Sequence, residues 1–215
     1  MRAICRTVLS LGVVALMVSP ALAQRPGGFG FGRGGMSAPM LLSNRGVQEE
    51  LKLSEEQVNK AESLARDMQG RMRDLFQSGG DPEERREKAQ KLNEEMRKSV
   101  ADILKPEQKK RFDQIELQSR GYLAFLDPEV QKKLNLTEEQ KDKLRDLARE
   151  SGERMRDLFQ AAGGDRQTAM QKIQTLRRET NEKAVALLTE DQKKTWKEMT
   201  GAPFEVRFER PRRID

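Results

Sequence analysis

The feature that most constrains the fold is an internal duplication. The segment VQEELKLSEEQ (47–57) recurs as VQKKLNLTEEQ (130–140), 83 residues later. RMRDLFQ (71–77) recurs without change at 154–160, at the same spacing. Repeats that keep their order and spacing indicate two copies of one supersecondary unit.

Within each copy the apolar residues recur at steps of three and four, which is the period of an amphipathic α-helix. The first copy carries Val58, Ala61, Leu64, Ala65, Met68, Met72, Leu75 and Phe76, and then Ala89, Leu92, Met96, Val100, Ile103 and Leu104. The second carries Leu144, Leu147, Ala148, Met155, Leu158 and Phe159, and then Met170, Ile173, Leu176, Ala184 and Leu187. The breaks SGGDP and AAGGD supply glycines to end one helix and an aspartate to cap the next. Each copy is therefore predicted to be a helical hairpin.

These patterns predict an all-α fold in which two tandem helical hairpins pack as an elongated or cradle-like bundle. A single hairpin has one apolar stripe and must bury it against another element. The predicted organisation is a signal peptide at 1–23, a Gly-rich flexible linker at 24–46, hairpin repeats at 47–126 and 127–200, and a flexible basic tail at 201–215.

The first 23 residues have the pattern of a secretory signal. MRAICR is a basic start, TVLSLGVVALMV is an apolar run, and Ala21 with Ala23 forms a small-residue cleavage site. We predict cleavage after Ala23 and a periplasmic protein; an extracellular protein and an uncleaved N-terminal anchor are the alternatives. No later segment has the apolar length that a bilayer requires, so no membrane insertion is expected after cleavage.

The residue inventory restricts the possible chemistry. The chain has no histidine, and Cys5, the single cysteine, lies in the predicted signal. The usual ligands of zinc, copper and nickel are then absent from the mature chain, and Ser-His or Cys-His nucleophilic sites are excluded. The remaining carboxylates, lysines, arginines and Tyr122 form no recognisable constellation. We therefore expect no enzyme, no cofactor and no metal site.

The charge is dense but nearly balanced. Removing Arg2 and Arg6 with the signal leaves 39 basic residues against 35 acidic ones, a net charge of about +4. Trp196 and Tyr122 are the only residues of their kinds, so platforms for base stacking are scarce. The stretch GFGRGG (30–35) is similar to RNA-binding RGG tracts, but a solvated linker is the better interpretation in an exported chain. No nucleic-acid partner is expected.

A five-residue motif stands before four of the predicted helices. LSEEQ, LTEEQ and LTEDQ are capping boxes, in which the Ser or Thr hydroxyl accepts from the third helical N–H and the Gln side chain accepts from the cap N–H. LKPEQ is a looser copy, because Lys105 is a poor cap. Pro106, which follows it, is well suited to the first helical position. The predicted motif residues are Leu53, Ser54, Gln57, Leu104, Gln108, Leu136, Thr137, Gln140, Leu188, Thr189 and Gln192.

The motif, the long charged helices after it and ILKPEQKKRF (103–112) resemble the LTXXQ-motif family of bacterial periplasmic proteins, the Spy/CpxP group. The resemblance covers about residues 47–200. It implies an all-helical cradle that binds unfolded or stressed proteins without ATP, or a regulator that damps an envelope-stress sensor.

The chain also departs from that family. Family members usually carry two such motifs per protomer and pair into a dimer, whereas this chain carries four. We therefore expect the two halves to form a pseudo-two-fold pair in one chain, with a homodimer as the alternative. Some relatives sense or bind metals, and the lack of His and mature Cys argues against that role here.

The candidate client-binding residues are the arginines of the duplicated RMRDLFQ, which combine charge with stacking: Arg71, Arg73, Arg154 and Arg156. A solvated face is the alternative interpretation. Their apolar neighbours are expected in the hairpin core: Met72, Phe76, Met155 and Phe159. A scaffold that docks on one sensor domain, through the tail GAPFEVRFERPRRID, is the second functional hypothesis.

Overall fold

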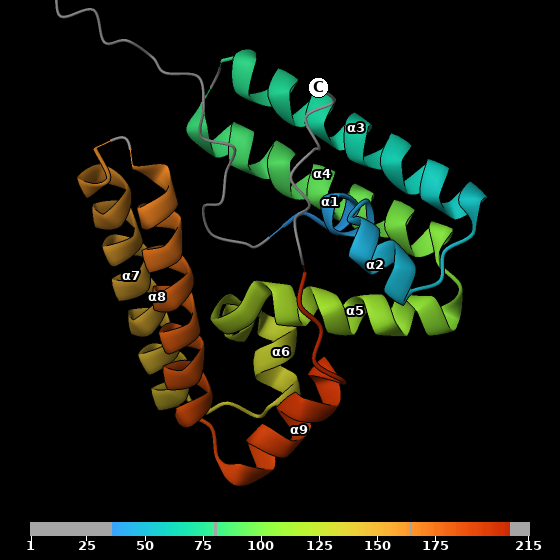
Figure 1. Ribbon diagram of the computed structural model, residues 1–215. Coiled ribbons are helices and arrows are strands. Elements are labelled where there is room, and N and C mark those ends of the chain that lie inside the picture. The colour runs from blue at the N-terminus through green and yellow to red at the C-terminus, as the bar shows by residue number, and fades with distance from the viewer. Residues whose placement is uncertain (1–35, 80, 164, 207–215) are drawn as a thin grey trace, which may run out of the picture.

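The computed structural model describes residues 36–79, 81–163 and 165–206. Within them the chain forms nine α-helices and one 3-10 helix, and no strand (Figure 1). The all-α prediction is confirmed. Outside the described residues lie the predicted signal peptide at 1–23, residues 24–35 of the predicted linker and residues 207–215 of the predicted tail.

The first half of the chain is an antiparallel arm on a helical base. Its elements are α1 (Ala38–Leu42), α2 (Arg45–Glu50), α3 (Glu55–Gln77), α4 (Pro82–Ile103) and α5 (Pro106–Arg120). Helices α3 and α4 pack along each other, and α1 contacts α3, α4 and α5 at the base of this arm (Figure 1). The buried side chains of α1, α2 and the base of the arm form one apolar core with α5.

The second half repeats this arrangement. Its elements are η1 (Gly121–Leu126), α6 (Pro128–Lys133), α7 (Glu138–Ala161), α8 (Arg166–Ala186) and α9 (Glu190–Thr200). Helices α7 and α8 form the second arm, η1 contacts both of them, and α5 packs on α9 to join the halves. In Figure 1 both arm tips lie toward the upper left of the view. None of the described helices combines the length and hydropathy that a membrane crossing requires.

The prediction of a flexible linker is wrong for residues 36–46. Leu41 and Leu42 of α1 are fully buried, and Asn44 caps α2 by accepting from the N–H of Val47. The apolar run APMLL is too short to show a helical period, and its burial depends on a surface that α3, α4 and α5 provide together.

The predicted boundary between the repeats, at residues 126 and 127, is also wrong. Residues 121–126 pack on the second arm as α1 packs on the first. Phe125 is buried, and its ring centroid lies 4.4 Å from that of Trp196 on α9. The segment therefore belongs to the second half, which begins at η1.

The beginning of the predicted flexible tail is packed as well. Phe204 and Val206 lie against the core of the first half. The N–H of Phe204 donates to Oε1 of Gln118 at 2.7 Å, and Arg111 donates to the carbonyl of Ala202 at 2.9 Å. Residues 201–206 thus bind the end of α9 to α5, a role that composition alone did not reveal.

Each five-residue motif at the start of an arm follows a left-handed turn. Lys52 and Asn135 both have a φ of 50°. After Lys52, the N–H of Leu53 donates to the carbonyl of Gln48 at 3.0 Å, which is the long bond of a Schellman motif. The leucine of the motif therefore ends one helix immediately before the next helix is capped.

Candidate functional site: the arm tips and the motif glutamines

The motif residues form reciprocal caps. Ser54 Oγ accepts from the N–H of Gln57 at 3.3 Å, and Gln57 Oε1 accepts from the N–H of Ser54 at 3.1 Å. At the looser copy only the second bond is made, because a lysine side chain cannot accept: Gln108 Oε1 accepts from the N–H of Lys105 at 2.9 Å. The full box recurs at Thr137 with Gln140 and at Thr189 with Gln192.

The glutamines also make tertiary contacts that the sequence did not predict. Gln57 Nε2 donates to Oε1 of Gln108 at 2.8 Å and to the carbonyl of Ile103 at 2.7 Å. Gln108 Nε2 donates back to Oε1 of Gln57 at 3.3 Å and to the carbonyl of Leu51 at 3.1 Å. The starts of α3 and α5 are therefore fastened to each other by a pair of side-chain amides.

The same fastening occurs in the second half. Gln140 Nε2 donates to Oε1 of Gln192 at 2.8 Å and to the carbonyl of Leu187 at 2.8 Å, and Gln192 donates back at 3.0 Å. One signal in the sequence could have indicated this role: LKPEQ keeps its glutamine although its capping residue is lost. Gln108 still accepts from the N–H of Lys105, and its amide nitrogen is free for the tertiary contacts described above.

The duplicated RMRDLFQ forms the outer ends of α3 and α7, next to the arm tips. None of its residues is buried in either copy, and the pattern of half-buried and exposed positions is the same in both. Met72, Leu75 and their counterparts Met155 and Leu158 are half-buried. The longest identical run shared by the two halves is thus a surface segment, where packing does not demand identity.

The expectation that the phenylalanines lie in the hairpin core is wrong. Phe76 is 65% exposed and Phe159 is 53% exposed. Leu75 already takes the inward position three residues after Met72, so the next residue turns about 100° away from the partner helix. Met170, predicted in the stripe of α8, is also 45% exposed, close to the tip of the second arm.

The four candidate arginines are all exposed but differ in their partners. Arg71 makes a two-bond contact across the arm to Glu95 of α4, at 2.6 and 2.8 Å, and this hydrogen bonding raises the pKa of Arg71. Arg154 pairs along its own helix with Glu150 at 3.0 Å. Among the described residues, no ion pair engages Arg73 or Arg156.

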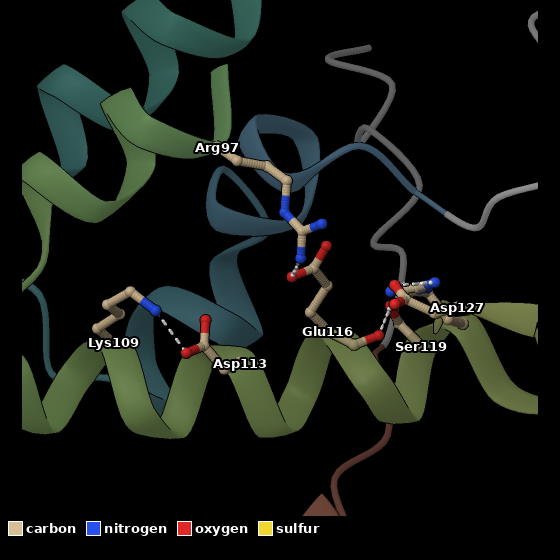
Figure 2. A network of polar contacts seen from close by, with 7 residues as sticks. Arg97, Lys109, Asp113, Glu116, Ser119 and Asp127 are labelled. Carbon is tan, nitrogen blue, oxygen red and sulfur yellow. Dashed lines mark hydrogen bonds and ion pairs between the residues drawn. The ribbon is translucent and has the colours of Figure 1, made fainter. Parts of the chain in front are cut away.

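The other concentration of charge lies where α4 meets α5. Figure 2 shows Arg97 reaching from α4 to Glu116 of α5, at 2.9 Å, and Lys109 pairing with Asp113 at 2.6 Å. Glu116 is buried, and an open cavity of about 230 Å³ lies beside it. The Arg97–Glu116 pair ties the arm to its base, whereas Lys109 and Asp113 pair along α5 itself.

No site for a metal emerges from the described residues, where no three acidic, cysteine or histidine side chains form a possible ligand group. Comparison with known proteins adds no relative: no family model, curated protein or solved structure matches the chain.

Proposed function

We propose that the protein is an exported, ATP-independent chaperone of the LTXXQ-motif, Spy/CpxP type, which holds unfolded or stressed proteins at its two arm tips. The observation that carries this proposal is the identical RMRDLFQ at both tips, with Phe76 and Phe159 turned to solvent. An exposed aromatic ring beside arginines offers apolar contact, stacking and charge at one place. Such a mixed surface suits clients that share no sequence.

The two arm tips provide two separate binding points for one client. They belong to separate arms joined through α5 and α9, so one chain offers two equivalent binding points. Two weak sites on one molecule bind a long flexible client more tightly than either site alone. This arrangement in one chain is the pseudo-dimer that we propose, and a monomeric mass in solution is expected.

The central test is suppression of aggregation by the purified mature protein. A denatured enzyme is diluted from guanidinium, and light scattering is followed with an equimolar amount of the protein. The wild type should suppress scattering, and the double variant F76A/F159A should lose most of that effect. A second, unrelated client should respond alike. Unchanged scattering with the wild type would contradict the proposed function.

The matched control is M40A, which removes an exposed apolar side chain from α1 at the base of the first arm. It should suppress aggregation as well as the wild type does. A second variant, R73A/R156A, removes the two arginines that have no ion pair within the described residues. Raising the salt concentration should reduce its suppression of aggregation less than it reduces that of the wild type, because the charge contribution of these arginines is already gone. If F76A/F159A retains full activity, the tips are not the binding surface.

The proposed location has its own measurement. Export and cleavage after Ala23 predict a mature chain that starts at Gln24. Intact mass of the protein recovered from the periplasm checks this. A mass that includes the first 23 residues would contradict the proposed export.

A further inference from the structure

Several interior positions differ between the two arms, but among the buried apolar positions of the first arm only Met68 and Met96 have polar counterparts in the second. In the first arm, Met68 of α3 and Met96 of α4 are 4% and 2% exposed, and they pack with Leu92 in an apolar cluster. The repeat spacing puts Ser151 and Thr180 at these positions in the second arm, where they are 2% and 3% exposed. Two thioethers in one arm are therefore replaced by two hydroxyls in the other.

The hydroxyls are satisfied but contribute little packing. Thr180 Oγ1 lies 2.7 Å from the carbonyl of Leu176 and 3.2 Å from Ser151 Oγ. A hydroxyl has one proton, so Thr180 donates to the carbonyl and accepts from Ser151. Neither group is left unpaired, yet the apolar contact area of two methionine side chains is missing from the α7–α8 interface.

A second contact is also missing from the second arm. Arg71 joins α3 to Glu95 of α4, and the corresponding residues of the second arm are Arg154 and Glu179. Arg154 instead pairs with Glu150 on its own helix. Among the described residues, no ion pair joins α7 to α8.

The base of the second arm is held more firmly than its outer part. Leu144 of α7 and Ala184 of α8 are buried in the second core with Phe125 of η1. The side chain of Asn181 accepts from the backbone N–H of Tyr122, which ties α8 to η1. The weakly held region of α8 therefore runs from Thr180, next to Asn181, back to the start of the helix at the arm tip.

We propose that the outer part of the α7–α8 arm opens while the α3–α4 arm and both cores stay folded. Local opening of this kind occurs where buried apolar contacts are few. Opening exposes Ile173 and Leu176, which are buried in the closed arm, in the same arm that already exposes Phe159 and Met170. It does not depend on the proposed function; if that function holds, the opened arm adds apolar surface next to one tip.

Native-state amide hydrogen exchange of the full chain, without a client, tests the opening. After correction for intrinsic rates, amides in 150–161 and 166–180 should exchange at least about tenfold faster than those in 67–77 and 82–96. Equal protection in the two arms would overturn the proposal. Since no client is present, failure of the chaperone assay leaves this measurement unaffected.

Exchanging the interior pairs between the arms tests the cause. S151M/T180M should slow exchange in the outer second arm toward the rates of the first, and M68S/M96T should make the first arm exchange faster. S151A/T180V removes both hydroxyls at nearly constant volume and provides a milder variant, which should also slow exchange. If neither S151M/T180M nor S151A/T180V slows exchange in folded protein, the hydroxyl pair does not cause the opening.

Discussion

The side-chain amides of Gln57 and Gln108 lie face to face, each donating to the oxygen of the other, at 2.8 and 3.3 Å. Each oxygen also accepts the N–H of its own helix cap, and each nitrogen also donates to a backbone carbonyl. Glutamine has both an acceptor and two donors, so it can make all of these bonds at once. Neither glutamate nor alanine can.

Replacing Gln57 by Glu should therefore destabilise the protein although size and shape are kept. The carboxylate would face the carbonyl of Ile103 and the amide oxygen of Gln108, with no proton to donate. We expect a loss of about 1–3 kcal/mol in the free energy of unfolding, measured by urea denaturation. Gln69→Glu, at an exposed position of the same helix, is the control and should change little. Equal effects of the two substitutions would show that the amide pair is unimportant.

The left-handed residue before the motif at the start of each arm predicts a pair of opposite effects. Lys52 has a φ of 50°, a conformation that asparagine tolerates better than lysine does, and Asn135 already occupies the equivalent turn. Lys52→Asn should raise the free energy of unfolding by a few tenths to about 1 kcal/mol. Asn135→Lys should lower it by a similar amount. Thermal unfolding of both variants measures the two shifts, and shifts of the same sign would contradict the backbone explanation.

The packed end of the chain predicts that Phe204 stabilises the fold. Phe204 is half-buried against the first core, and its N–H is held by Gln118. Phe204→Ala should lower the free energy of unfolding, measured by urea denaturation, by about 1–3 kcal/mol, because it removes a half-buried ring that packs on the first core. The same substitution at Phe76, which is exposed, should leave stability almost unchanged. A larger loss at Phe76 than at Phe204 would be inconsistent with the packing described above.

Asp127 predicts a dependence of stability on pH. Burial by itself raises the pKa of its carboxyl, but hydrogen bonds from Arg120 and from the N–H of Glu129 outweigh burial and lower the pKa below the ordinary 3.8. Because the folded pKa is depressed, this stabilisation is complete above the unfolded value and is lost as the pH falls through the folded value. Asp127→Asn should be less stable than the wild type at pH 7, by about 1 kcal/mol.

That difference should shrink once the pH falls below 3.8. Chemical denaturation of both proteins at pH 7 and at successively lower pH values measures it. A difference that stays constant with pH would mean that the charge of Asp127 does not contribute.

Hydrophobic periodicity was sufficient to predict the long helices, because residues such as Ala61, Ala65 and Met68 recur at the helical step and must share a face. The caps were equally accessible, since Ser54 and Gln57 are neighbours in the chain and bond within one turn. The short elements α1 and η1 were not predicted, because each has too few residues for a period.

For the arm tips, too, one part of the prediction was correct and another part was wrong. The duplication of RMRDLFQ marked the segment and its four arginines from the sequence alone. The orientation of Phe76 and Phe159 was predicted wrongly, because Leu75 and Leu158 already take the inward positions at the helix ends and the next residue turns away from the partner helix.

The sequence by itself determined what depends on neighbours along the chain: two repeated sets of amphipathic helices, their caps and their breaks. Only the tertiary structure decided what depends on distant residues that meet. It pairs Gln57 with Gln108 and Gln140 with Gln192, and it packs Phe204 on the opposite half. It also turns the tip phenylalanines to solvent and gives the arms unequal interiors. The physical reason is that local hydrogen bonds and period are encoded within a few residues, whereas burial exists only once separate helices have come together.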